Sequence, residues 1–323
     1  MKKKILLFVM FFLLIPLFGC SIQKAYEGTA YYFGTVITIS IKADKEDVSE
    51  HFENICNIFE HYDLISSQYT RADNNVYAIN HSSDFVTVDE DLVDMLKLAL
   101  ELKEKTNGHF NVLVGNVAND YKDIIYNGKE ALSNTLDYYI DEINNSNIII
   151  DGLNVKIEGS AKIDLGAIAK GYALAKVKEY LQGNSITEYI INCGASSLAM
   201  GEKSGDYFII GIKYDESNKL YIKNYDLGCA SSNEQFTYIG EEKIHHIINP
   251  LTCLPSSNHE AVYLIGEDSS LLDAFSTAFM SMELADIRRI CTEYNLYYIV
   301  YDNNDIVYKS IDGVYYDSKT YQK

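Results

Sequence analysis

Residues 163–171, with the sequence IDLGAIAKG, constrain the fold of this chain more than any other segment. An alternating run before them predicts a strand, and the apolar spacing over residues 167–181 predicts a helix that ends at Gly183. Gly166 lets the backbone approach a ligand closely, while the helix start and the charge of Lys170 attract anions. This strand–turn–helix unit indicates a pyrophosphate site. Short motifs also arise without function, and then Lys170 is a solvated lysine and Gly166 a packing glycine.

The first twenty residues have the pattern of a bacterial targeting segment. Lysines at positions 2–4 precede an apolar core over residues 5–17, which is shorter than the ~20 residues that span a bilayer. The sequence LFGC at residues 17–20 resembles a lipobox. We therefore expect a lipoprotein signal peptide at residues 1–19, lipidation of Cys20, a lipidated tether at 20–30 and one domain at 31–318. Such a chain would be lipid-anchored at the cell membrane, on its extracytoplasmic face; an uncleaved signal anchor is the alternative.

The charge balance narrows the range of partners. The chain carries 27 Lys and Arg against 46 Asp and Glu, a formal net charge of −19. Such an acidic surface disfavours nucleic acid and anionic lipid, so we expect no nucleic-acid partner. A bound polyphosphate would need a local cation such as a metal. If Cys20 is lipidated, an odd number of cysteines remains, which favours small buried hydrophobes over a complete disulfide framework.

Apolar periodicity predicts a mixed order of elements. A strand is expected at residues 35–42, helices at 48–62, 90–105, 269–282 and 284–294, and a polar, Asn-rich excursion over the site at 120–146. Short strands dominate from residue 147, at 147–150, 154–158, 188–193, 207–213, 219–224, 236–240, 243–248 and 260–266, before a hairpin near 297–309. Without regular βαβ alternation, this order predicts an α+β fold in a single domain.

Two further groups of residues suggest chemistry. Asp273 and Thr277 lie four apart on one helix face, and two hard oxygen ligands suit Mg²⁺ or Ca²⁺. The alternative is that Asp273 caps another segment and Thr277 bonds a helical carbonyl. His245 and His246 end a strand just before a proline turn, where a histidine can act as a general base or be an ordinary surface residue. Cys193 follows an apolar strand, which predicts an inert, buried thiol.

These segments together resemble the ApbE family, the FAD:protein FMN transferases. The resemblance runs from about residue 32 to residue 281. It rests on FGT at 33–35, SQY at 67–69, TNGHFN at 106–111, IDLGAIAKGYA at 163–173, NCG at 192–194, ASS at 230–232, HHIINPLT at 245–252 and DAFST at 273–277. The order and spacing of these segments carry the resemblance, together with the lipobox, which many members of the family share.

The resemblance implies a fold and a set of roles. The fold would be a single mixed α/β domain of the ApbE type, derived from the T-fold, with antiparallel-rich sheets. His246 would be the catalytic base. The metal ligands would be Ala167 (through its carbonyl), Asp273 and Thr277. The positions that would contact FAD are Phe33, Tyr69, Phe110, Asn111, Asp164, Lys170 and Ile247.

The implied activity is transfer of FMN from FAD to a Ser or Thr hydroxyl of an extracytoplasmic acceptor protein, with release of AMP. FAD would be the substrate and Mg²⁺ the cofactor, with Ca²⁺ as the alternative ion. The acceptors would be flavoprotein subunits of Rnf- or Nqr-type complexes, or other extracytoplasmic flavoproteins. The chain departs from the usual family pattern at Ser196, at Asn249, and at Ser232 and Asn233. An FAD pyrophosphatase and a non-catalytic FAD-binding lipoprotein are the alternatives.

Overall fold

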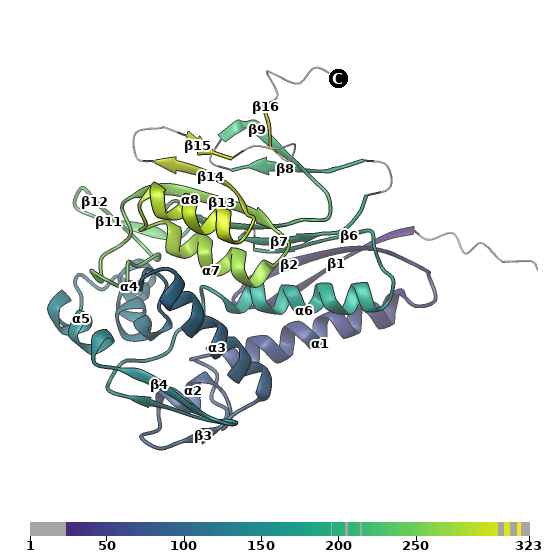
Figure 1. The fold of residues 1–323 in the computed structure, drawn as a ribbon. Coiled ribbons are helices and arrows are strands. Elements are labelled where there is room, and N and C mark those ends of the chain that lie inside the picture. The colour runs from purple at the N-terminus through teal and green to yellow at the C-terminus, as the bar shows by residue number, and fades with distance from the viewer. Residues whose placement is uncertain are drawn as a thin grey trace, which may run out of the picture.

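The computed structural model describes residues 24–194, 196–203, 206–213, 215–302, 307–310 and 315–317. Its largest element is an antiparallel sheet of eight strands (Figure 1). The strand order is β1-β2-β6-β7-β10-β13-β14-β15. The strands are β1 (Lys24–Tyr32), β2 (Thr35–Ala43), β6 (Tyr189–Cys193), β7 (Ser197–Met200), β10 (Asp226–Ser231), β13 (His259–Gly266), β14 (Tyr297–Asp302) and β15 (Val307–Lys309).

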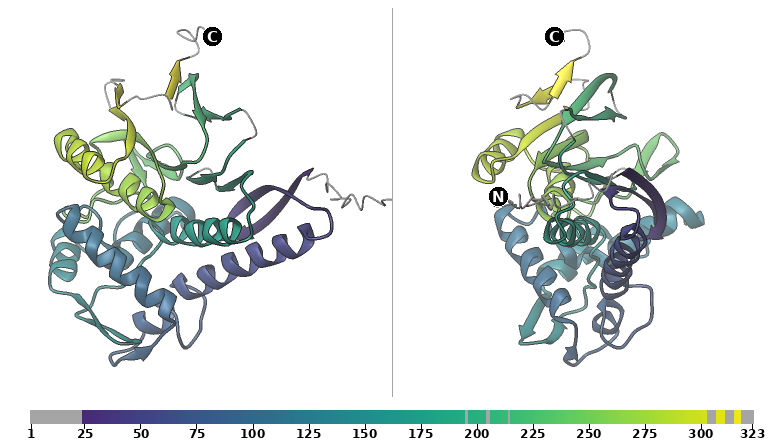
Figure 2. Two further views of the ribbon diagram at one scale, coloured as in Figure 1. Left: turned by 45° about the vertical axis from the view of Figure 1, so that its right-hand side comes forward. Right: turned by 90° about the vertical axis from the view of Figure 1, so that its right-hand side faces the viewer.

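Several helices share the main core with one face of this sheet. They include α1 (Val48–Ser66), α6 (Ala169–Gly183), α7 (Ser269–Phe279) and α8 (Leu284–Glu293), and Figure 2 shows α1 and α6 running side by side along the sheet. Ile37, Ile39 and Ile41 alternate along β2 and are fully buried in this core, together with Phe59 of α1 and Phe275 of α7. Burial of large apolar side chains from both layers supplies the main stabilisation of the fold.

A small sheet covers the opposite face of the large one. Its order is β16-β9-β8, with β8 (Phe208–Ile212), β9 (Asp215–Ile222) and β16 (Tyr315–Asp317). Leu220 and Ile222 of β9 pack with Leu198, Leu227 and other inward residues of the large sheet in a second apolar cluster.

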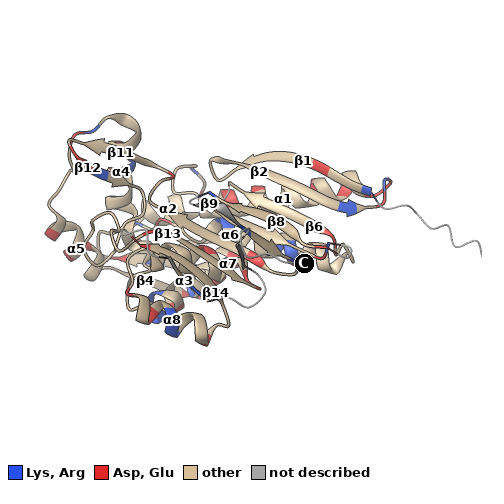
Figure 3. Cartoon of the chain, turned by 90° about the horizontal axis from the view of Figure 1, so that it is seen from above, with Lys and Arg blue, Asp and Glu red and all other residues tan. Residues whose placement is uncertain are grey.

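The remaining elements form a lobe beside the sheet. It holds α2 (Val76–Asn80), α3 (Glu90–Lys105), a short 3₁₀ turn at Val112–Val114, α4 (Gly115–Asn127), α5 (Leu136–Asn144) and the sheet β3-β5-β4, made of β3 (Val86–Thr87), β5 (Asn154–Glu158) and β4 (Asn147–Asp151). A two-stranded hairpin, β11 (Phe236–Ile239) and β12 (Glu242–His245), packs beside α4, as Figure 3 shows from above. A third apolar cluster joins this hairpin to α4 and α5.

The α+β prediction is confirmed, and most predicted elements agree with the structure. Two predicted segments differ, and strands including β7 and β10, in the middle of the large sheet, were not predicted. Residues 120–146, expected as a polar excursion, are largely helical in α4 and α5, because Tyr121, Ile124, Tyr139 and Ile143 form the apolar sides of two short helices. The predicted tether at 20–30 overlaps β1, which pairs with β2 along its whole length from Lys24, so the sheet begins before residue 31.

The structure does not test the predicted targeting segment. Residues 1–23, with the proposed signal peptide and Cys20, lie outside the described residues. Every helix in the described part of the chain is too short or too polar to cross a membrane.

Cys56, Cys193, Cys229, Cys253 and Cys291 are free thiols, each at least half-buried. Burial raises the pKa of the Cys193 thiol far above its ordinary value, as expected for an inert cysteine.

Candidate active site

The start of α6 meets α7 at the carboxylate of Asp273. The Gly171 N–H donates to Oδ2 of Asp273 at 2.9 Å, and the Ser197 hydroxyl donates to Oδ1 at 3.0 Å. The ammonium of Lys170 lies 4.0 Å from Oδ2. Glycine is required at position 171, because a Cβ there would lie 2.2 Å from the Ser269 carbonyl oxygen. The contacts hold this buried carboxylate in one orientation.

The contacts of Asp273 also bear on the positions of the other two predicted metal ligands. The Gly171 N–H lies in the first turn of α6, where a helix offers no carbonyl partner, and the Asp273 carboxylate caps it; Ala167 lies just before Ile168, the N-cap residue of this helix. The Thr277 hydroxyl donates to the backbone oxygen of Asp273 at 3.3 Å. These are the capping and carbonyl contacts of the alternative interpretation. The donor set of carboxylate, hydroxyl and carbonyl oxygens also fits a hard cation such as Mg²⁺.

A second polar cluster surrounds Asp164, just before α6. Its Oδ1 accepts the Gly166 N–H at 2.7 Å, and its Oδ2 accepts the ammonium of Lys122 at 2.9 Å. Lys122 also donates to the hydroxyl of Tyr69 at 2.9 Å. Burial would raise the pKa of Asp164, but the Lys122 ammonium and the Gly166 N–H hold it below its ordinary value. Asp164 is therefore an anion paired with Lys122.

The two adjacent histidines have different environments. His245 is buried, with Nε2 2.8 Å from the Ser256 carbonyl oxygen and Nδ1 accepting the Ile247 N–H at 3.3 Å, so its ring is fully used in holding the chain. Nδ1 of His246 lies 3.3 Å from the Gln235 carbonyl oxygen. A carbonyl only accepts, so Nδ1 carries the proton and Nε2 has the lone pair of a base.

Charged residues of both polar clusters affect the pKa of His246. Burial lowers the pKa of His246 to about 4, and the positive charges of Lys170 and Lys122 act in the same direction. The imidazole is therefore neutral near pH 7 and able to accept a proton.

The remaining predicted FAD contacts are partly core residues. Phe110 and Ile247 are 3% and 4% exposed and belong to the main apolar cluster, so their side chains offer little surface to a ligand. The Asn111 side chain accepts the Leu113 N–H at 3.0 Å and caps the 3₁₀ turn. Phe33 has a positive φ of 52° at the β1–β2 turn, and its ring meets Phe59 edge to face.

The structure reveals site residues that sequence reasoning missed. Lys122 comes from α4, in the segment expected to be a polar excursion, and Ser197 opens β7. The helical spacing of Val117, Tyr121 and Ile124 marks the buried face of α4 and would have placed Lys122 on the other side. Nothing local in the sequence singles out Ser197.

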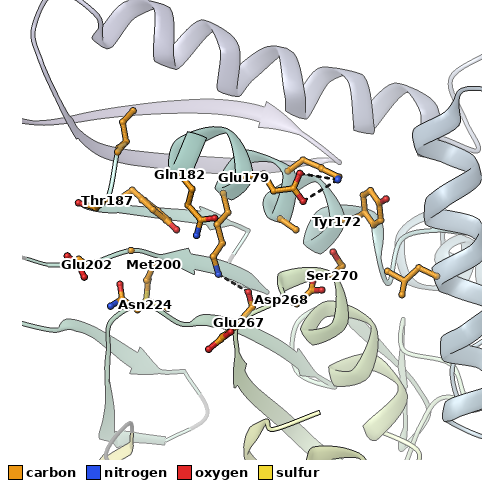
Figure 4. Close-up of a pocket in the computed structure, with 17 residues that line it drawn as sticks. Tyr172, Glu179, Gln182, Thr187, Met200, Glu202, Asn224, Glu267, Asp268 and Ser270 are labelled. Atoms are coloured by element: carbon orange, nitrogen blue, oxygen red, sulfur yellow. Dashed lines mark hydrogen bonds and ion pairs between the residues drawn. The ribbon is translucent and has the colours of Figure 1, made fainter. Parts of the chain in front are cut away.

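Two features lie apart from these clusters. A cavity of about 690 Å³ follows the C-terminal half of α6, and none of the predicted site residues is among the described residues that line it (Figure 4). His61, Asp89 and Asp91 bring ligand atoms within 4.8 Å of one another, and Nε2 of His61 lies 3.0 Å from Oδ2 of Asp91. This triad is about one-third exposed and shares no residue with the predicted metal set.

The architecture is that of the flavin transferase structures. The described fold superposes on an ApbE protein from Thermotoga maritima with a TM-score of 0.78, at 24% identity, over 89% of this chain and 97% of that one. It superposes on the flavin transferase ApbE from Vibrio cholerae with a TM-score of 0.73, at 19% identity, with the same two coverages.

The sequence comparisons identify the family. The chain belongs to the ApbE family, whose model matches residues 33–300. It is 22% identical over 272 residues to the FAD:protein FMN transferase of Klebsiella pneumoniae, covering 80% of this chain and 83% of that relative. It is 24% identical over 284 residues to the FAD:protein FMN transferase of Treponema pallidum, covering 79% of this chain and 78% of that relative. The resemblance found in the sequence is confirmed.

Proposed function

We propose that this chain transfers FMN from FAD to a Ser or Thr hydroxyl of an acceptor protein and releases AMP. Family membership and the names of the relatives support the reaction class. The observation that carries the proposal is the state of His246, a neutral imidazole within electrostatic reach of Lys122 and Lys170. A proton acceptor in the electrostatic field of two lysines suits the attack of a hydroxyl on a phosphorus.

The transfer of FMN requires one bond to form, one bond to break and one proton to move. The acceptor hydroxyl attacks the FMN-side phosphorus of FAD, and the bond from that phosphorus to the bridging oxygen breaks. The proton of the hydroxyl passes to Nε2 of His246, and AMP leaves with the bridging oxygen. Lys170 lies at the start of α6, where its charge and the helix N–H groups favour the pyrophosphate. Such reactions depend mainly on positioning and charge stabilisation.

Ala167, Asp273 and Thr277 are the residues that would hold a cation. When bound, Mg²⁺ would neutralise charge on the pyrophosphate and so make AMP a better leaving group. The Gly171 N–H and the Ser197 hydroxyl hold the Asp273 carboxylate in place. Ca²⁺ is the alternative ion.

The proposal includes the cellular location of the chain and the class of protein that receives FMN. Lipidation at Cys20 would anchor the chain at the cell membrane, on its extracytoplasmic face. The acceptor would then be an extracytoplasmic flavoprotein, such as a subunit of an Rnf- or Nqr-type complex. The lipobox-like sequence at residues 17–20 supports this part of the proposal.

Intact-mass analysis tests the reaction directly. The chain starting at Ser21 is incubated with FAD, Mg²⁺ and a candidate acceptor domain, and the acceptor is then weighed. A gain equal to FMN minus water, lost with EDTA, is the expected result. An unmodified acceptor with accumulating AMP would indicate an FAD pyrophosphatase instead. Intact FAD with several different acceptors would indicate a binding protein.

A further inference from the structure

We infer that Lys122 is a positioning residue that holds two predicted FAD contacts, Tyr69 and Asp164, in their binding geometry. This inference rests on the proposed function, because it concerns the same FAD site. Lys122 lies on α4, which follows the 3₁₀ turn at Val112–Val114 and packs against the β11–β12 hairpin. A single ammonium group there joins three segments that are far apart in the sequence.

The contacts of Lys122 are short and specific. Its Nζ donates to Oδ2 of Asp164 at 2.9 Å and to the hydroxyl of Tyr69 at 2.9 Å. The same ammonium lies 5.3 Å from the centroid of the Tyr69 ring. The Lys122 side chain is 35% exposed and that of Asp164 is 11% exposed, so solvent screens this pair less than an ordinary surface ion pair. Bonds of this charge-assisted kind are among the stronger ones in proteins.

Tyr69 needs such support, because it is exposed. Its side chain is 63% exposed, and its ring makes no large contribution to the core. The hydroxyl is held by two side chains of α4, donating to Oδ1 of Asn119 at 2.8 Å and accepting from Lys122. Asn119 and Lys122 lie three apart and so share one helix face. Fixing the hydroxyl fixes the ring in advance, which reduces the entropy lost when a planar ligand stacks on it.

Asp164 needs Lys122 for a different reason. It directs the turn into α6 through its bond to the Gly166 N–H, beside the predicted pyrophosphate position. An uncompensated carboxylate there would repel phosphate. Lys122 cancels this charge while leaving the carboxylate able to hold the turn.

The chain offers a matched control pair. Lys178 of α6 bonds Asp226 of β10 at 3.0 Å, and it also donates to the Glu267 carbonyl oxygen at 2.7 Å. This pair is at least as buried as the Lys122–Asp164 pair. Lys178 lines the cavity in Figure 4, and none of the predicted site residues is among the described residues that line it. Loss of Lys178 therefore reports the purely structural cost of breaking a buried lysine–aspartate bond.

FAD titrations of the full chain, followed by flavin fluorescence, test the inference. Lys122→Met keeps the apolar stem and removes the charge, and we expect it to raise the Kd for FAD about tenfold or more, as loss of charge-assisted bonds predicts. Lys122→Arg should restore most of the affinity. Lys178→Met should change the Kd less than about twofold. Equal effects of Lys122→Met and Lys178→Met, or no effect of Lys122→Met, would overturn the inference.

A double-mutant cycle separates positioning from a general structural effect. Since Lys122 acts partly through Asp164, the variant Lys122→Met/Asp164→Asn should lose less FAD affinity than the sum of the two single losses, and what Lys122→Met still costs in the Asp164→Asn background is the share carried by Tyr69. Fully additive losses would contradict the inference. FAD binding does not depend on transfer, so a wild-type chain that binds FAD but modifies no acceptor would contradict the proposed function while these titrations still decide the role of Lys122. A wild-type chain that binds no FAD would contradict both.

Discussion

Gly171 and Asp273 meet where α6 and α7 cross, with the backbone N–H of one 2.9 Å from the carboxylate of the other. This contact makes helix packing part of the site, because the approach that brings the carboxylate to the start of α6 is possible only without a side chain at position 171. The two most informative sequence segments, at 163–171 and 273–277, are thereby joined.

Adding one methyl group at this crossing should damage both stability and activity. A Cβ in Gly171→Ala would lie 2.5 Å from Cβ of Asp273, so the helices must separate. We expect a loss of ~1–3 kcal/mol in the free energy of unfolding, typical of overpacking, measured by urea denaturation, together with a loss of transfer activity. Gly183→Ala is the control, since it lies in the same helix with open space around it, and it should be neutral or slightly stabilising. A fully active Gly171→Ala would contradict the assigned site.

Removing the charge of Asp273 should abolish FMN transfer with little change in shape. Asp273→Asn keeps the side-chain volume but weakens cation binding and its attraction to Lys170. Ser197→Ala removes only the bond to Oδ1, so we expect a smaller loss, about tenfold, which excess Mg²⁺ partly restores. Intact-mass assays over a Mg²⁺ titration measure both. Full transfer by Asp273→Asn at low Mg²⁺ would refute the predicted metal set.

Much of this architecture was predictable from local patterns. The helix at Glu90–Lys105 and the strand at Asn154–Glu158 have the predicted bounds, because amphipathic periodicity and turn residues mark them directly. Strand β1 was missed because it lies at the sheet edge, where every residue keeps some exposure and no clear apolar alternation develops. Helices α4 and α5 were missed because their few apolar residues are spaced among many polar ones.

The site could be predicted only in part, for a related reason. Asp273 and Lys170 carry their signal in local motifs, but the bond from Lys122 to Asp164 joins residues 42 positions apart. No local spacing encodes such a contact. Likewise, burial separates His245 from His246, although the sequence presents two adjacent and equivalent histidines.

The two histidines should separate stability from activity. His245→Ala leaves the Ser256 carbonyl and the Ile247 N–H without their partner, so we expect a loss of ~1–3 kcal/mol in the free energy of unfolding. His246→Ala removes one long hydrogen bond and should cost far less stability, yet it should abolish transfer. Chemical denaturation and mass analysis of both variants measure this contrast. If His245→Ala abolished transfer at little cost in stability while His246→Ala retained transfer, His245 would be the base.

Protonation of His246 sets the acid limit of the reaction. Burial lowers its pKa to about 4, with Lys170 and Lys122 acting in the same direction, so the basic form should persist from pH 7 down to about pH 5. We expect kcat/KM to be nearly flat in this range and to fall near pH 4, with the fold checked by circular dichroism at each pH. A midpoint near the ordinary value of 6.5 would contradict the lowered pKa of this base. The same group also couples pH to stability: the unfolded chain takes up the proton near pH 6.5 and the folded chain only near pH 4, so stability should decline as pH falls between these values. His246→Gln lacks the proton uptake and should show a shallower decline over that interval.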